Sequence, residues 1–343
     1  MYGRSAVGSK GPVGWVGSGS AAAPEADMAF SPLWVLSLSG CPPAYRFRPP
    51  DSVVTLGGSL GAARRGSLRD VRLSHVITAL EELYPPEWAE SWDAVGLVCG
   101  DPAQEVGRVL FAVDPVAAVI DEALEWGADL VVTHHPLLLR GVHSVAATTP
   151  KGRLVHRMIR NGVALHTAHT NADRAEPGVS DALARAVGLT GELRPMVPAD
   201  DDPRRGLGRI GELAEPVTLR EFTGRVAAGL PSTAWGVRAA GDPDRAVRTV
   251  AVCGGAGDSL LGTARDAGVD VYLTADLRHH PASEFTEQGG PALVDAAHWA
   301  TEWPWLADAE RRLAAASPDA GKLETRVSTL VTDAWRLHDE GAH

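Results

Sequence analysis

The chain has 343 residues, of which 45% are hydrophobic and 22% charged, enough for one large or two medium globular domains. Its 32 Lys and Arg face 43 Asp and Glu, and the formal net charge of −11 disfavours binding to the phosphate backbone of nucleic acid. Three cysteines without CxxC spacing are typical of a reducing compartment, and no apolar run reaches the roughly 18 residues of a membrane helix, so we expect a cytoplasmic protein.

Residues 1–71 are rich in Gly, Ser, Ala and Pro and show no sustained hydrophobic period. This composition predicts a disordered extension, or a start-site artefact ahead of the working domain. Folded structure is expected from residue 72 onward. There, Ser74 is the predicted N-cap of a helix that ends before Pro85.

Strand-like and helix-like segments then alternate along the chain. The first series comprises strands at 109–113, 129–133 and 163–168 and helices at 116–126 and 152–160. A second series follows a polar, Pro-rich break at 198–205, with strands at 249–253, 269–274 and 292–296, a helix at 259–267 and a long helix to about residue 315. Such alternation predicts parallel βαβ units.

The two series also resemble each other. Residues 122–133 and residues 263–274 both have the pattern of a helix that ends at a Gly and is followed by an apolar strand. We therefore predict an α/β fold of two related αβ lobes. The first spans residues 72–197, the second is completed within residues 198–343, and a binding site is expected in the cleft between them.

Metal-binding side chains follow three of the predicted strands. His134 and His135 come directly after one strand, Asp173 lies just beyond the next, and His298 follows a third. The carboxyl ends of parallel strands are where ligands bind in open α/β sheets. Glu302 lies four residues after His298 in a predicted helix, so both side chains project from the same helix face.

Mixed imidazole and carboxylate ligands suit Zn, Fe, Mn or Co, and differ from the Cys-rich ligands of a structural zinc site. The side chains of the neighbours His134 and His135 diverge, so each can hold a different ion, with Glu302 or Asp173 as the bridging carboxylate. The pattern predicts two divalent metal ions, an arrangement typical of metal-assisted hydrolysis. We expect Glu302 to be the catalytic residue as well as a ligand.

Other histidines are assigned lesser roles. A lone histidine near a strand end is usually a hydrogen-bonded structural residue, which is our interpretation of His143, His156 and His166. His169 can orient the Asp173 carboxylate by hydrogen bonding. His280 can contact a substrate, but it lies too far beyond the end of the preceding predicted strand to be a metal ligand.

A glycine-rich run at residues 253–257 follows a strand and opens a helix, a position at which backbone amides can bind phosphate. It lacks the Lys-Ser/Thr pair of a P-loop, and Asp258 would repel phosphate there. A plain tight turn is the favoured interpretation.

Four motifs make the chain similar to a known family. They are ADLVVTHHP at 128–136, AHTNAD at 168–173, TADL at 274–277 followed by His280, and DAAHWATE at 295–302. From about residue 72 to residue 333, including ESWDAVG at 90–96, the chain resembles the GTP cyclohydrolase 1 type 2 homologue family, also called Nif-three-like proteins. Ala94, Ala172 and Ala297 depart from the usual family residues, but none of these changes removes a ligand.

The resemblance carries the ligands of the family over to His134, His135, Asp173, His298 and Glu302, the same five residues. It implies a dinuclear divalent-metal site between two αβ lobes, a ring-like homohexamer, and a hydrolase that acts on a nucleotide-like small molecule. The stretch between Asp173 and Thr249 is too short for the inserted domain of some members, so we expect the short form.

The same ligands would also serve a protein without catalytic activity. The alternative hypothesis is therefore a metal-binding, metal-delivery or scaffold protein in which the ions are not catalytic. A transcription-associated or nucleic-acid-binding role is disfavoured by the acidic composition.

Overall fold

The computed structural model describes residues 71–316 and 320–339. The extension predicted for residues 1–71 therefore lies outside the described residues, apart from Val71, which begins strand β1 (Val71–Arg72). Strand β1 pairs antiparallel with β3 (Glu105–Val106). In the described part of the chain, no helix is long and apolar enough to cross a membrane.

The first large sheet has five strands in the order β15-β4-β5-β6-β2. Their bounds are β2 (Gly96–Cys99), β4 (Arg108–Ala112), β5 (Leu130–Thr133), β6 (Ala164–Thr167) and β15 (Glu324–Val327). All but β2 run parallel. Every residue of β5 and β6 is buried, as expected for central strands of a parallel sheet with both faces covered.

Helices cover both faces of this sheet. Helices α2 (Ala117–Trp126) and α3 (Pro150–Arg160) pack on one face, where Ile120 and Met158 belong to the same hydrophobic core as Leu165 of β6. Helices α1 (Leu73–Leu83) and α9 (His298–Ala316) pack on the other.

The second large sheet has six strands in the order β11-β14-β13-β12-β10-β7. Their bounds are β7 (Leu189–Arg194), β10 (Arg209–Thr218), β11 (Val237–Ala240), β12 (Ala246–Ala256), β13 (Val271–Ala275) and β14 (Ala292–Ala296). Strands β12, β13 and β14 run parallel, whereas β7, β10 and β11 pair antiparallel. The sheet is therefore parallel at its centre and antiparallel at its edges.

This sheet is covered on both faces too. Helices α5 (Val179–Ala186) and α6 (Leu219–Gly229) pack on the same core as α9, whereas α7 (Leu261–Asp266) and α8 (His279–Glu287) pack on the opposite face. The remaining elements are helix α4 (Thr170–Arg174), the hairpin of β8 (Val197–Pro198) and β9 (Gly206–Leu207), and 3-10 turns at Pro86–Trp88, Asp258–Leu260 and Ala320–Lys322.

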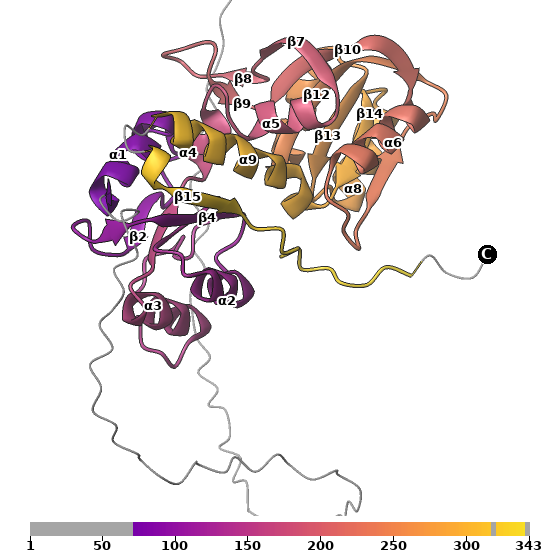
Figure 1. The fold of residues 1–343 in the computed structure, drawn as a ribbon. Coiled ribbons are helices and arrows are strands. Elements are labelled where there is room, and N and C mark those ends of the chain that lie inside the picture. The colour runs from indigo at the N-terminus through magenta and orange to yellow at the C-terminus, as the bar shows by residue number, and fades with distance from the viewer. Residues whose placement is uncertain (1–70, 317–319, 340–343) are drawn as a thin grey trace, which may run out of the picture. The chain divides into compact units, whose positions relative to one another are not determined.

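Helix α9 lies between the two sheets (Figure 1). Trp305, Leu306 and Leu313 of this helix are fully buried in one hydrophobic core that contains strands of both sheets. A residue near the start of α9 is therefore held by both halves of the fold. This matters because α9 begins at His298, one of the predicted ligands.

The predicted mixed α/β fold is confirmed, and the structure corrects several details. Arg72, not Ser74, occupies the N-cap position of α1, because the amides of Leu73 and Ser74 are bonded to Gln104 and Pro102. The helix predicted at 259–267 starts as a 3-10 turn. In the two large sheets, strands β2, β7, β10, β11 and β15 were not predicted.

The two similar segments do fold alike. Both have a helix, a glycine with left-handed backbone and a buried strand: α2, Gly127 (φ 75°) and β5, and α7, Gly268 (φ 66°) and β13. Strand β7 lies before residue 197 in the sequence but pairs in the second sheet. Strand β15 lies after residue 197 but pairs in the first sheet. The domain division at residue 197 stays a prediction.

The stretch between Asp173 and Thr249 lies wholly within the described residues. It forms helices α5 and α6, the β8–β9 hairpin, and the start of β12. It also forms strands β7, β10 and β11, which belong to the second large sheet. All of it is used by the fold, as expected for the short form.

Candidate metal centre

The five predicted ligands come together at the carboxyl ends of the parallel strands. His134 and His135 follow β5, and their amides continue its ladder with β4 by donating to the carbonyls of Ala112 and Val113. Asp173 lies in α4, the short helix after β6. His298 opens α9 after β14, and Glu302 follows one turn later.

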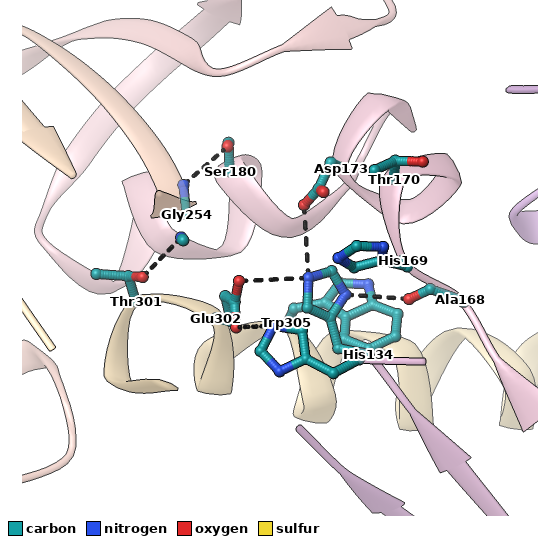
Figure 2. A network of polar contacts seen from close by, with 12 residues as sticks. His134, Ala168, His169, Thr170, Asp173, Ser180, Gly254, Thr301, Glu302 and Trp305 are labelled. Carbon is teal, nitrogen blue, oxygen red and sulfur yellow. Dashed lines mark hydrogen bonds and ion pairs between the residues drawn. The ribbon is translucent and has the colours of Figure 1, made fainter. Parts of the chain in front are cut away.

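Glu302 lies at the centre of the cluster. Its Oε1 is 2.9 Å from His298 Nε2 and 3.5 Å from His134 Nε2, and its Oε2 is 3.1 Å from His135 Nε2. Asp173 Oδ1 is 3.7 Å from His134 Nε2 (Figure 2), and the ring centroid of Trp305 lies 5.4 Å from that of His134. One carboxylate therefore faces three imidazoles, and a second carboxylate flanks one of them.

Each imidazole of the cluster is held at its other nitrogen. The Nδ1 atoms of His134, His135, His169 and His298 lie 3.0, 2.7, 2.8 and 2.7 Å from Ala168 O, Asp114 Oδ1, Asp93 Oδ1 and Asp276 Oδ2. Such partners fix the orientation of a ring, and they leave Nε2 available to a metal ion. This arrangement is characteristic of histidine ligands.

The three carboxylates that hold these rings, Asp93, Asp114 and Asp276, were not identified as functional from the sequence. Asp114 and Asp276 each follow a parallel strand, β4 and β13, just as the histidines do. An acidic residue just beyond a parallel strand was the available signal. Asp93 lies in the motif at 90–96, whose role had not been interpreted.

His169 lies within the cluster. Its ring centroid is 5.2 Å from that of His134 and 5.7 Å from that of His135, and ligand atoms of these three histidines lie within 4.8 Å of one another. A second group of this kind comprises His135, His298 and Glu302. The predicted role of His169 in orienting Asp173 stays a prediction.

His280 lies elsewhere. It is an exposed residue near the start of α8, and its ring is 5.1 Å from that of His279. Its predicted contact with a substrate stays a prediction.

Glu302 is buried with an exposed fraction of 3%. Burial raises the pKa of its carboxyl, yet the positive charges of His135 and His298 outweigh burial and hold that pKa well below its usual range. Its Oε2 has no hydrogen-bond partner among the described residues, although it lies within ion-pair distance of His135. A buried anion that lacks a donor is costly unless a positive charge compensates it.

The histidines respond to the same charge. The Glu302 carboxylate raises the pKa of His298 to about 11, against the opposing effect of burial. Burial lowers the pKa of His135, but Glu302 and Asp114 outweigh it and raise that pKa to about 10. The cluster therefore favours positive charge around Glu302, which bound protons or metal ions can supply.

The glycine-rich run borders the cluster. Strand β12 continues to Ala256. The amide of Gly254 donates to Ser180 Oγ at 3.4 Å (Figure 2), and the amide of Gly255 donates to Thr301 Oγ1 at 2.9 Å. These two amides are occupied and do not form a phosphate cradle. Gly255 has a φ of 67°, and a Cβ at this position would lie 2.5 Å from Glu302 Oε1.

A cavity of about 340 Å³ opens beside the cluster. Its lining includes the potential ligands His169, Asp173, His298 and Glu302, together with Trp92 and Cys253. Trp92 is 58% exposed, and its ring meets His169 edge-on. The cluster therefore faces a space large enough for a small molecule.

Comparisons with known proteins identify the family. A protein-family model described as Duf34/NIF3 (NGG1p interacting factor 3) matches residues 71–334 of this chain. A Streptomyces coelicolor protein named GTP cyclohydrolase 1 type 2 homolog is 60% identical over 270 residues, which cover 78% of this chain and 94% of that protein. A Clostridium perfringens protein of the same name is 33% identical over 237 residues, covering 69% and 88% of the two chains.

Solved structures share the fold. A Bacillus cereus protein related to NIF3 matches with a TM-score of 0.70 and 24% identity, over 77% of this chain and 98% of that one. A Staphylococcus aureus protein matches with a TM-score of 0.69 and 26% identity, over 78% and 99%. The chain belongs to the Duf34/NIF3 family, which confirms the resemblance inferred from its motifs.

Proposed function

We propose that this chain binds two divalent metal ions and is a metal-dependent hydrolase. His135, His298 and Glu302 would hold one ion, and His134, Asp173 and Glu302 the other, with His169 beside the pair. Glu302 carries the proposal, because its two carboxylate oxygens face three imidazole Nε2 atoms at 2.9 to 3.5 Å, while Oε2 has no hydrogen-bond donor in the described part of the chain. The donor set of imidazoles and carboxylates fits Zn, Fe, Mn or Co.

Two such ions, when bound, supply Lewis-acid activation of water and of the bond that is attacked. The protein's own part is orientation. Asp114 and Asp276 hold the rings of His135 and His298, and burial of Glu302 keeps bulk water from competing for its carboxylate. Glu302 would be the catalytic residue in the sense that its carboxylate is shared by both ions.

The proposed substrate is a nucleotide-like small molecule. The relatives are named GTP cyclohydrolase 1 type 2 homolog, and the cavity beside Glu302 has a volume within the usual range for small-molecule sites. Trp92 offers an exposed aromatic face on the wall of that cavity.

Metal analysis of the reconstituted chain, followed by assays against nucleotides and phosphoesters, tests this proposal. We expect two ions per chain and turnover by the wild type, and loss of both in Glu302→Gln. Glu212→Gln is the matched control, because Glu212 is exposed and pairs with Arg248 on the surface. Turnover no higher than that of Glu302→Gln would contradict the hydrolase.

That outcome, with two ions bound, would instead support the metal-binding, metal-delivery or scaffold protein. A wild type that binds no metal after reconstitution would overturn both functions. From the resemblance we also propose a ring-like homohexamer, which sedimentation velocity distinguishes from a single 36.0 kDa chain.

A further inference from the structure

Residues 328–335, here called the C-terminal strap, follow strand β15 without forming a helix or strand. The amide of Ser328 donates to Phe111 O at 2.8 Å, and its hydroxyl donates to Glu122 Oε2 at 2.6 Å. Trp303, the neighbour of Glu302 on α9, donates through Nε1 to Ser328 O at 2.9 Å. The strap therefore starts from a point that is bonded to both β4 and α9.

Four residues further on, Thr332 of the strap contacts Asp114, the carboxylate that holds the predicted metal ligand His135. The hydroxyl of Thr332 donates to Asp114 Oδ2, and the other oxygen of the same carboxylate, Oδ1, lies 2.7 Å from His135 Nδ1. The strap ends with Trp335, whose ring lies 5.8 Å from that of Trp235. A chain of polar contacts thus runs from Thr332 through Asp114 to His135.

This contact determines how Asp114 holds the ring. A carboxylate bonded through one oxygen can rotate about its Cβ–Cγ bond, and the imidazole it holds can move with it. Fixing the second oxygen removes that freedom, and partners of this kind tune metal affinity. Asp93 is fixed in the same way, since Oδ1 holds His169 and Oδ2 accepts from the hydroxyl and amide of Thr170.

The two threonines lie at different places along the chain relative to the histidines they help to hold. Thr170 is the immediate neighbour of His169 in sequence, so the segment that carries the histidine also carries the threonine that fixes Asp93, although Asp93 itself is 77 residues away. Thr332 is 218 residues from Asp114, and its contact exists only when the strap is seated. The strap is not part of either sheet, so no strand pairing holds Thr332 in place.

We propose that Thr332 is a positioning residue of the metal centre, which acts through Asp114 on His135, and that the seated strap is needed for full metal affinity. This inference rests on the proposed metal binding but not on the proposed hydrolysis. It predicts that a change far along the chain from the five ligands alters the site itself.

The test uses the full-length chain and Co²⁺, whose visible absorption reports the geometry of its ligands. The variants are Thr332→Val, which removes the hydroxyl, Thr332→Ser, which keeps it, and Thr325→Val. Thr325 lies in β15 and has no hydrogen-bond partner for its hydroxyl among the described residues, so it is the matched control. Affinity is measured by competition with a chromophoric chelator.

We expect Thr332→Val to weaken Co²⁺ binding about tenfold and to change the absorption spectrum. Thr332→Ser and Thr325→Val should bind as the wild type does. In an Asp114→Ala background the Thr332→Val change should have no further effect, because the contact it removes is already absent. This cycle separates a positioning role from general loosening of the strap.

Wild-type affinity in Thr332→Val, equal weakening in Thr332→Ser, or additive effects with Asp114→Ala would each overturn the inference. A wild type that fails to bind Co²⁺ would overturn the proposed metal site and this inference with it. A wild type that binds Co²⁺ but has no turnover would contradict only the hydrolase, and the variants would still decide the role of Thr332.

Discussion

Gly255 faces the Glu302 carboxylate with a hydrogen atom where any other residue carries a carbon. An added Cβ would lie 2.5 Å from Glu302 Oε1 and 3.1 Å from His298 Nε2, and the φ of 67° is unfavourable for other residues. Glu302 is buried among imidazoles, so its carboxylate cannot move aside freely. The glycine is therefore a steric requirement of the site.

Gly255→Ala should reduce the metal content of the reconstituted protein to one ion or fewer per chain. Gly224→Ala is the control, because it lies in helix α6 and its added Cβ meets nothing within 4 Å. That change should leave metal content unaltered and stabilise the fold by up to about 1 kcal/mol. Elemental analysis and thermal unfolding measure both effects, and full metal content in Gly255→Ala would contradict the steric argument.

Some residues of the site could be predicted from sequence and others could not. The spacing of His298 and Glu302 specifies a shared helix face, and the structure places their nearest atoms 2.9 Å apart. Asp114 and Thr332 could not be paired in advance, because no local pattern connects residues 218 positions apart. Contacts of that kind depend on the tertiary fold.

At the scale of the elements, the buried parallel strands were the most predictable. Strand β14 has the predicted bounds, Ala292–Ala296, because all five of its residues are buried and a glycine-containing turn precedes it. Strand β10 was missed, since it contains charged residues and Pro216. It begins with Arg209, a fully buried residue of a type that is usually exposed.

Arg209 is tolerated there because its guanidinium is fully engaged. It bonds to both oxygens of Asp181 in α5 at 2.9 and 2.8 Å and to the carbonyls of Gly206, Gly208 and Ala175. One side chain thus joins β10 to α5 and to the segment that follows Asp173. A planar fork is required for this set of contacts.

Arg209→Lys should lower the free energy of unfolding by about 3 kcal/mol, because lysine leaves Asp181 and several carbonyls without donors. Arg248→Lys in β12 is the control, since Arg248 is 56% exposed and pairs with an equally exposed Glu212. Its effect should stay below about 1 kcal/mol. Urea denaturation measures the free energy of unfolding of both variants. Equal losses would contradict a stabilising role of the buried Arg209 guanidinium.

At the scale of the whole molecule, the proposed ligands come from both halves of the chain. His135 and His298 are 163 residues apart in sequence, yet their Nε2 atoms are separated by 3.3 Å. A metal ion bound at this point, as proposed, would bind the folded chain and not the unfolded one. It should therefore stabilise the fold by about 2.7 kcal/mol at a free concentration one hundred times its Kd.

Removal of metal with a chelator should accordingly lower the midpoint of thermal unfolding by about 5 °C or more, and Zn²⁺ should restore it. Glu302→Gln should show neither change. Differential scanning calorimetry with and without chelator measures the shift. An identical midpoint in both conditions would contradict a tightly bound metal.

The sequence separation of the ligands has a consequence for biosynthesis. A ribosome makes His134, His135 and Asp173 first, and His298 and Glu302 emerge 125 or more residues later. Glu302 is added to the nascent chain after His298, and Thr332 follows 30 residues later. A metal ion held by all five residues would therefore bind late in folding, when strands β4, β5 and β6 of the first sheet have long been synthesised.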